Sequence, residues 1–463
     1  MEFIGRKEEL KYLEQLYNTK PTFVVIYGKR RVGKTELIKQ FTKNKLSIYY
    51  YIDNKKSLNQ INEELQEILK EKNLLEKDIT LNTFKATLKY TLKQNIILAI
   101  DEFQRIEKID PTLINSLQEI IDLEKNQAML IVSGSALGMM KKIFLETKAP
   151  LFKRAQLIHN LQDFSFKETC QILEKLNIKS FEEKIKIYAL FGGSIFYYDL
   201  IEKFDCKNFD EILETLFLSK IAPLKNEIED WLIEQFGKLN KTYFQILYAL
   251  SIGKNTKNTI TDITEIKETS LSAYLDDLKD LLGVVEYELP INELPHSKKG
   301  KYKISHNFFK FWFKYLYKNL NKLELNETNE IKKYINLNFN NDLGHIFENI
   351  CQEYLIEQNK KSNLPFKIEK IGRYWKKHEE IDRIILNEKE QKIMFVECKY
   401  KNNQIGMKTY DELKKKSQNY NFNGKKYYCI ISKSGFKNKL IEYAKNNTNI
   451  ILIDINQIEK EFK

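Results

Sequence analysis

The stretch TFVVIYGKRRVGKTELIKQF, residues 22–41, decides the fold of the first part of this chain. It opens with Thr22–Tyr27, whose apolar and β-branched residues predict a buried strand. Gly28–Thr35 follows with the pattern G-x-x-x-x-G-K-T, and the amphipathic segment Glu36–Phe41 predicts a helix. A glycine-rich loop between a strand and a helix lets backbone N–H groups surround phosphate oxygens, and the helix dipole adds attraction. The stretch therefore predicts a nucleoside triphosphate site.

Two carboxylates complete the predicted site. The strand predicted at Ile96–Ile100 ends in Asp101 and Glu102, and charges after an apolar strand are costly unless they face a cation or water. We expect Thr35 and Asp101 to hold Mg²⁺, Lys34 to reach the β- and γ-phosphates, and Glu102 to polarise the attacking water. Glu102 favours an ATPase over a passive nucleotide binder. The predicted cofactor-binding residues for ATP are Gly28, Lys29, Arg30, Arg31, Val32, Gly33, Lys34, Thr35 and Asp101.

Further polar residues near this site have two interpretations each. The strand predicted at Met129–Val132 runs into Ser133-Gly134-Ser135, where either serine could touch the γ-phosphate or its water, or form part of a simple turn. Arg154 could stabilise transition-state charge in a neighbouring subunit, or be one more solvated basic residue. The sequence leaves both pairs of alternatives open.

Composition narrows the class of protein. The 463 residues are 42% hydrophobic and 30% charged, which excludes global disorder. The net charge of +12 fits a polyanionic partner such as DNA, or simply a lysine-rich composition. Five scattered cysteines without a CxxC pair indicate a reducing compartment and no zinc site. The charged start and the short apolar runs argue against a signal peptide or a membrane span, so we expect a soluble cytoplasmic protein.

Changes of pattern predict four domains, at residues 1–160, 161–238, 239–320 and 321–463. The first alternates apolar runs with amphipathic segments, which predicts a parallel sheet covered on both faces. The second loses the strand pattern and predicts a helical lid. The third predicts three helices and a hairpin, a winged helix-turn-helix. The fourth predicts a separate α/β domain. The predicted fold class is therefore α/β, with the first and fourth domains each built around a sheet.

The winged helix gives mixed signals about DNA. The helix that begins at Ser270 would be the recognition helix, and lysines in the turn Ser297–Lys301 suit phosphate contacts. Asp276, Asp277 and Asp280 on the same helix would repel a phosphate backbone. DNA binding and a packing role both remain open.

The fourth domain contains a candidate metal site. Side chains alternate across a strand, so Glu397 and Lys399 share a face, and a hairpin pairing would bring Asp382 beside them. Asp382 and Glu397 would ligate Mg²⁺ and Lys399 would orient water, with Glu348 as a further acidic contributor. This arrangement resembles the PD-(D/E)XK nuclease pattern. The alternative is a surface hairpin with ordinary alternating charges.

Six segments resemble, in order, the motifs of archaeal and bacterial ATPases related to AAA+ and signalling (STAND) NTPases: FIGRKEEL, GKRRVGKT, LAIDEFQR, VSGSALGMM, PLFKR and FGGSIFYY. That family carries a C-terminal domain of unknown function that resembles restriction-type nucleases. The resemblance implies a P-loop NTPase sheet with a restriction-endonuclease-like C-terminal domain. It also implies that Gly5 and Arg6 lie near the adenine and that Gly192-Gly193 closes the lid. Ile195 and Lys153 depart from the family's usual proline and glycine.

These observations lead to an ATP-hydrolysing switch coupled to a C-terminal domain that binds and cleaves DNA. The alternatives are an ATP-gated DNA-binding regulator, or a scaffold, whose nuclease fold is silent. A nucleotide-dependent homo-oligomer fits each of them.

Overall fold

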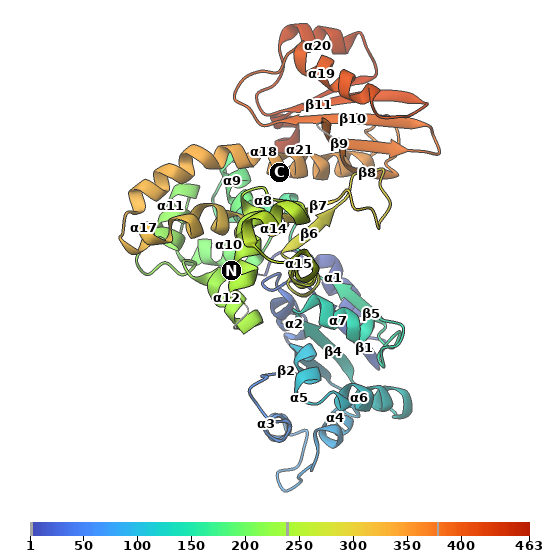
Figure 1. Ribbon diagram of the computed structural model, residues 1–463. Helices are drawn as coiled ribbons and strands as arrows, with labels where there is room; N and C mark the ends of the chain where they lie inside the picture. The colour runs from blue at the N-terminus through green and yellow to red at the C-terminus, as the bar shows by residue number, and fades with distance from the viewer. Residues whose placement is uncertain (1–2, 238–239, 377–378) are drawn as a thin grey trace. The chain divides into compact units, whose positions relative to one another are not determined.

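The computed structural model describes residues 3–237, 240–376 and 379–463, which form two compact units (Figure 1). The first unit runs to Asp163 and includes Ser194–Asp199 and Asp276–Gly283. The second contains Phe164–Gly193, Leu200–Leu275 and Val284–Lys463. The division into four domains stays a prediction, and its boundary at 238–239 lies outside the described residues.

The first unit is built around a five-stranded parallel sheet with the order β2-β3-β4-β1-β5. Its strands are β1 (Thr22–Tyr27), β2 (Ser47–Tyr51), β3 (Ile97–Asp101), β4 (Met129–Gly134) and β5 (Leu157–Asn160). The predicted α/β fold with a parallel sheet is confirmed. The edge strand β5 was not predicted, because its sequence LIHN is only partly buried and lacks a continuous apolar run.

Helices cover both faces of this sheet (Figure 1). Alternate residues of β1 enter different cores: Val24 and Ile26 pack with α1 and α2, whereas Phe23 and Val25 pack on the opposite face. This burial on two sides explains why the strand is apolar at every position. The helices are α1 (Lys7–Tyr17), α2 (Lys34–Thr42), α3 (Leu58–Glu71), α4 (Phe84–Leu92), α5 (Ile106–Ile109), α6 (Thr112–Leu123) and α7 (Leu137–Phe144), with the 3₁₀ turn η1 (Phe103–Arg105).

The second unit begins with helices around a large aromatic core that includes Phe217, Phe308 and Trp312. Helix α10 (Ile195–Lys203) has residues in both units. The other elements of this region are α8 (Phe166–Lys175), α9 (Phe181–Phe191), α11 (Phe209–Leu213), η2 (Glu214–Leu218), α12 (Glu227–Phe236), α16 (Asn307–Phe311), η5 (Trp312–Leu316), η6 (Tyr317–Asn319), α17 (Leu320–Glu324) and the long α18 (Thr328–Lys360).

Three helices and a hairpin occupy the region predicted as a winged helix. The helices are α13 (Asn240–Ser251), α14 (Lys257–Thr264) and α15 (Glu268–Asp276), the last continued by the π-helical turn η4 (Asp277–Leu281). The strands β6 (Val285–Glu288) and β7 (Lys301–Ile304) pair antiparallel. The winged-helix assignment itself stays a proposal.

The C-terminal part contains a second five-stranded sheet, with the order β12-β11-β10-β9-β8. Strands β8, β9 and β10 form an antiparallel meander, whereas β11 and β12 run parallel to β10. Helix α18 contacts one face through Arg383, and α19 contacts the other through Tyr410 and Leu413. The bounds are β8 (Lys370–Lys376), β9 (Glu379–Asn387), β10 (Lys392–Lys399), α19 (Met407–Gln418), β11 (Lys425–Ser432), α20 (Asn438–Lys445), β12 (Ile450–Asp454) and α21 (Ile455–Phe462).

Across the described ranges, each helix is too short or too polar to cross a bilayer. The five cysteines are buried and free.

Candidate nucleotide site and C-terminal carboxylate site

The loop between β1 and α2 needs glycine at two positions, one for its backbone conformation and one for lack of space. Gly33 has φ 94°, in the left-handed region, and caps the N-terminus of α2. A Cβ on Gly28 would lie 2.4 Å from the carbonyl oxygen of Leu161. Arg31 also has a positive φ of 71°. Left-handed residues in such a loop turn successive N–H groups toward one concave side, which suits an anion.

The side chain of Lys34 lies inside this loop. Its Nζ donates to the carbonyl oxygens of Gly28 and Lys29, both at 2.9 Å, and the residue is 6% exposed. Burial lowers the pKa of Lys34, while the charges of Glu102 and Asp101 act against that shift. A buried ammonium at the mouth of an N–H-lined loop is suited to a polyphosphate.

The Asp101 carboxylate at the end of β3 accepts three hydroxyl hydrogen bonds. The donors are Thr35 (2.7 Å), Tyr49 (2.6 Å) and Ser133 (2.6 Å), which come from α2, β2 and β4. Burial opposes charge on Asp101, but these donors outweigh it and hold the pKa of Asp101 below its ordinary value. An ionised carboxylate beside a threonine hydroxyl is a donor set that Mg²⁺ accepts.

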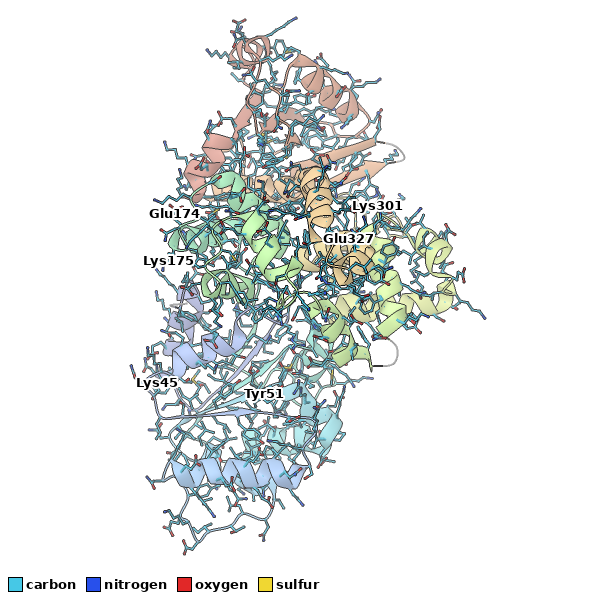
Figure 2. The ribbon with its side chains drawn as sticks, turned by 90° about the vertical axis from the view of Figure 1, so that its left-hand side faces the viewer. Lys45, Tyr51, Glu174, Lys175, Lys301 and Glu327 are labelled. Atoms are coloured by element: carbon cyan, nitrogen blue, oxygen red, sulfur yellow. The ribbon has the colours of Figure 1, made fainter. Side chains whose placement is uncertain are left out.

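Glu102 has a different set of partners. It stands in the left-handed region (φ 55°), and its Oε2 accepts from Ser135 Oγ at 2.9 Å and from Gln104 Nε2 at 2.5 Å. Arg105 lies 3.8 Å away and also donates to the hydroxyl of Tyr51, which is labelled on β2 in Figure 2. The two neighbouring carboxylates therefore have different side-chain hydrogen-bond donors.

The structure places both serines on the acid pair. Ser133 is fully buried in β4 and donates to Asp101, and Ser135, in the bend after β4, donates to Glu102. Sequence reasoning missed Tyr49 and Gln104, which reach the pair from the neighbouring strand and from the turn after β3.

Arg154 is engaged within its own chain. Its guanidinium binds both oxygens of Asp122, at 2.8–3.0 Å, and donates to the carbonyl oxygen of Pro150 at 2.6 Å. Any action in a neighbouring subunit would first require this pair to separate.

Segments distant in sequence brace the phosphate loop from outside. Arg6 is buried, and its guanidinium donates to the carbonyl oxygens of Val32 (3.2 Å) and Gln162 (2.6 Å). The Arg31 guanidinium lies 3.8 Å from the centre of the Phe196 ring, a cation–π contact. These contacts tie the segments around Gly5 and after Gly193 to the loop without assigning them to an adenine.

In the C-terminal sheet the structure brings together Asp382, Glu397 and Lys399, as predicted. The pairing of Val396 with Arg383 sets the register, and Asp382 Oδ2 accepts from the N–H of Cys398 at 2.7 Å. Lys399 binds Glu397, and Lys416 of α19 lies 3.3 Å from the same carboxylate. Burial raises the pKa of Asp382 to about 7, and the charges of Glu397 and Glu348 add to this shift.

The carboxylate of Glu348 contacts a different set of residues. Its carboxylate lies 3.4 Å from Arg383, 3.6 Å from Arg373 and 3.0 Å from His345. Among residues 3–237, 240–376 and 379–463, no three His, Cys, Asp or Glu side chains stand close enough together to hold a metal ion. A metal at Asp382 and Glu397 would therefore take further ligands from water or substrate.

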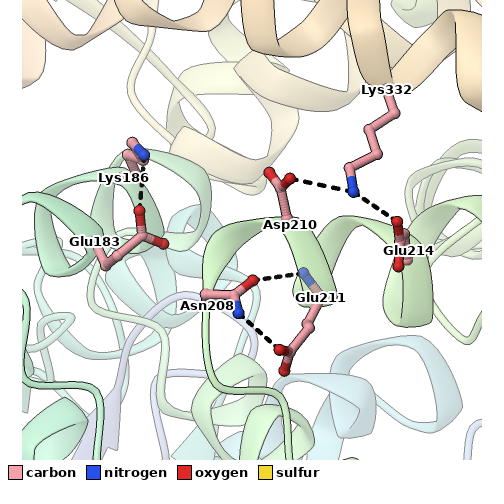
Figure 3. A pocket seen from close by; sticks show the side chains of 7 residues that line it. All are labelled: Glu183, Lys186, Asn208, Asp210, Glu211, Glu214 and Lys332. Atoms are coloured by element: carbon pink, nitrogen blue, oxygen red, sulfur yellow. Dashed lines mark hydrogen bonds and ion pairs between the residues drawn. The ribbon is translucent and has the colours of Figure 1, made fainter.

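A separate acidic hollow of about 520 Å³ lies between α9, α11, η2 and α18 (Figure 3). Its carboxylates already have partners: Lys332 binds Asp210 and Glu214, and Glu183 binds Lys186. Ion pairs within and between helices therefore account for the charged residues that line this hollow.

The parallel sheet, with a G-x-x-x-x-G-K-T loop and an acid pair at its carboxyl edge, defines a protein of the P-loop ATPase class. Residues 3–201 match a family described as an ATPase domain predominantly from Archaea. Residues 312–417 match a family described as archaeal and bacterial proteins of unknown function. An uncharacterized protein of Methanocaldococcus jannaschii is 32% identical over 98% of this chain and 99% of its own length. The chain therefore belongs to this family of archaeal proteins with an ATPase domain and a C-terminal domain of unknown function.

Two further matches agree with this assignment. An uncharacterized ATP-binding protein of the same organism is 24% identical over 62% of this chain and 80% of its own length. The structure of a Walker-type ATPase of Pyrococcus abyssi aligns with a TM-score of 0.53 at 19% identity, over 67% of this chain and 96% of that one. The second match supports the fold alone.

Proposed function

We propose that this chain binds ATP with Mg²⁺ at the loop Gly28–Thr35 and hydrolyses it. The observation that carries the proposal is the hydrogen bond between Thr35 and Asp101, which joins the loop to the acid pair. The similarity to an ATP-binding protein of M. jannaschii supports ATP as the nucleotide.

The donor set fits Mg²⁺ and a triphosphate. Thr35 and Asp101 would hold the metal ion, which would neutralise charge on the β- and γ-phosphates. Lys34 would exchange its carbonyl partners for phosphate oxygens. Glu102 would orient the attacking water and accept its proton, and Ser135 and Gln104 fix the position of that carboxylate.

Substitution of Lys34 tests this proposal. Lys34→Ala removes the buried ammonium and should lower ATP turnover by 100-fold or more, about 3 kcal/mol or greater. Lys39→Ala is the matched control, because Lys39 lies on the same helix with its side chain 58% exposed. Phosphate release is measured with Mg²⁺ in excess. Equal turnover in Lys34→Ala and Lys39→Ala would contradict the proposed site.

We also propose that the C-terminal sheet acts on the phosphodiester backbone of DNA. The support is the shared face of Asp382, Glu397 and Lys399 on an antiparallel hairpin. Asp382 and Glu397 would hold Mg²⁺, and Lys399 would orient water or offset charge at the cleaved phosphate. The net charge of +12 supports a polyanionic partner.

A silent version of the same site is the second candidate. Lys399 and Lys416 both contact Glu397, and these two cations compete with a metal ion for that carboxylate. In this case the part would bind DNA in an ATP-controlled manner without cutting it.

Cleavage assays separate the two candidates. Linear and plasmid DNA are incubated with Mg²⁺ or Mn²⁺, with and without ATP, using the wild type, Asp382→Asn and the exposed control Asp411→Asn on α19. Cleavage lost only in Asp382→Asn supports the active site. Salt-dependent DNA binding without cleavage supports the silent version, and cleavage that survives Asp382→Asn contradicts the assigned residues.

A further inference from the structure

A second cavity, of about 780 Å³, lies within the second unit. Its lining contains neither Asp382 nor Glu397, although Arg373 and Arg383, which contact Glu348, belong to it. Its walls come from the hairpin β6–β7, the segment α16–η5, helix α18 and strands β8 and β9. Pockets of 300–1,000 Å³ are of the size that holds a small organic ligand. The question is which chemistry this wall would recognise.

Lys310, on α16, is a positively charged residue of the cavity wall. It lines the cavity, and within the part of the chain that the structure describes its ammonium makes no hydrogen bond and no ion pair. Burial lowers the pKa of Lys310. The charge of Asp342 acts against that shift, and the charges of Lys314 and Lys303 add to it. Lys310 is only partly buried, and no carboxylate of the described residues pairs with it, so an anion in the cavity would gain a charge-assisted contact. Its presence in a cavity wall points to an anion as the missing partner.

The carboxylates of the cavity wall are already paired. Asp342 binds Lys314 and accepts from the hydroxyl of Tyr315. Glu286 and Glu288 both bind Lys303, at 2.8 and 3.0 Å. These carboxylates are therefore occupied by other partners, and Lys310 remains a positive group in the wall.

A buried donor without a partner lies in the same wall. The Nε of Arg373 is buried and has no hydrogen-bond partner among the described residues. Its two terminal nitrogens are engaged by Glu288, Glu348 and Glu380, which fix the guanidinium in place. The unpaired ammonium of Lys310 and the unsatisfied Nε of Arg373 thus belong to one cavity.

An aromatic side chain adds a surface for a base. Trp375 lines the cavity, with the ammonium of Lys301, labelled in Figure 2, 4.9 Å from its ring centre. Indole rings stack on nucleobases, whichever base is present. The amide side chains of Asn349 and Gln352 line the same cavity and offer polar contacts.

We propose that this cavity binds a nucleotide-sized phosphate ester, with Lys310 as the anchor for its phosphate. The phosphate ester is either a free nucleotide or one unit of a nucleic-acid strand, which share this chemistry. The inference goes beyond the proposed function, because it requires neither ATP hydrolysis nor cleavage at Asp382.

Calorimetric titration of the full chain tests the proposal. No ADP is added, because ADP is itself a nucleotide and would compete for the cavity, and binding at the loop site is common to the wild type and the Lys310 variants. The probes are cytidine monophosphate, a single-stranded DNA 10-mer and inorganic phosphate. For each probe that binds the wild type, Lys310→Met should raise the Kd about tenfold, as expected for loss of one charge-assisted contact. It should also raise the Tm of the chain without probe slightly, because it removes an unpaired, partly buried charge.

Lys332→Met is the matched control. It removes the same charge from the acidic hollow of Figure 3, where Lys332 has two carboxylate partners. It should leave probe affinity unchanged and should lower the Tm slightly. Lys310→Gln, which keeps a polar group, serves if Lys310→Met does not fold, and it should also weaken the probe.

The outcomes separate the sources of the ligand. Binding of cytidine monophosphate that depends on Lys310 supports a free nucleotide, and such binding of the DNA 10-mer alone supports a strand. Binding by no probe, by inorganic phosphate alone, or with equal affinity in the wild type and Lys310→Met overturns the proposal. ATP turnover is measured separately on the wild type, so that its absence counts against the ATPase and not against this cavity.

Discussion

At the scale of single residues, the acid pair at the end of β3 shows how neighbouring carboxylates acquire different properties. Asp101 receives three hydroxyl donors that stabilise its charge, whereas Glu102 is held by Ser135 and Gln104. These different partners support the roles proposed above, with Asp101 at a metal ion and Glu102 at the attacking water.

Tyr49 is a residue whose role follows from this geometry. Tyr49→Phe removes one donor to Asp101 and should weaken the binding of Mg²⁺. The Mg²⁺ concentration that gives half-maximal turnover should rise about tenfold. Tyr50→Phe is the matched control, because its hydroxyl also donates to a carboxylate, that of Glu64, at 2.8 Å. The measurement is a Mg²⁺ titration of ATP turnover. Equal curves for the two variants would argue against a role for Tyr49.

Asp382 gives a prediction for pH. Its pKa is raised from 3.8 to about 7 in the folded chain, so the folded state binds this proton more tightly than the unfolded state does. Its contribution to stability is therefore present below pH 4 and is lost as the pH rises from about 4 to 7. Without metal ions, Asp382→Asn should stabilise the chain at pH 8 by on the order of 1–3 kcal/mol, and far less at pH 4.5.

Thermal unfolding in EDTA at these two pH values provides the measurement. Asp411→Asn, on the exposed surface of α19, should change the Tm little at either pH. A destabilising effect of Asp382→Asn at pH 8 would show that the carboxylate is stabilised in its charged form.

At the scale of elements, the turn between β1 and α2 needs glycine at position 33 because the backbone there is left-handed. Helix α18 has no such need at Gly344. Gly33 has φ 94°, but a Cβ on Gly344 would meet no atom within 4 Å. Gly33→Ala should therefore cost about 1–2 kcal/mol of stability, and Gly344→Ala should add about 0.5–1 kcal/mol. Denaturant unfolding of both variants checks these opposite signs. Two changes of the same sign would contradict the assignment of strain to the loop.

Much of the architecture could be predicted because its segments have regular patterns. The apolar runs at β1, β3 and β4 and the motif after β1 mark the first sheet without ambiguity. The strand β8 was missed, because its sequence KIGRYWK does not alternate apolar and polar residues. The first half of α18 was missed because it is rich in asparagine, a weak helix former, and packing supplies what propensity lacks.

The sites could be predicted where a motif, a strand end or a hairpin places the residues. Asp101 and Glu102 follow an apolar strand, so their position at a sheet edge is evident. Tyr49 reaches Asp101 only through the pairing of β2 with β3, in which Tyr51 stands opposite Asp101. Sheet order is a property of the folded chain, and no spacing in the sequence encodes it.

At the scale of the whole molecule, two units carry separate sites. The nucleotide loop belongs to the first unit, and the carboxylate site and the Lys310 cavity belong to the second. Ligands of each unit should therefore stabilise that unit alone. ADP with Mg²⁺ at 100 times its Kd should stabilise the first unit by about 2.7 kcal/mol.

Differential scanning calorimetry tests this separation. We expect two transitions, of which ADP with Mg²⁺ shifts one, and in Lys34→Ala that shift should disappear. An equal shift of both transitions would mean that the units unfold together and that the ligand acts on the chain as a whole.

The central claim is that the loop Gly28–Thr35 binds ATP and that the neighbouring acid pair prepares it for hydrolysis. The most direct test is titration of the wild type and Glu102→Gln with ATP and Mg²⁺ by calorimetry, together with phosphate release from the same samples. The account predicts that both proteins bind ATP and that only the wild type releases phosphate. Absence of binding heat in the folded wild type, or equal phosphate release from the two proteins, would contradict it.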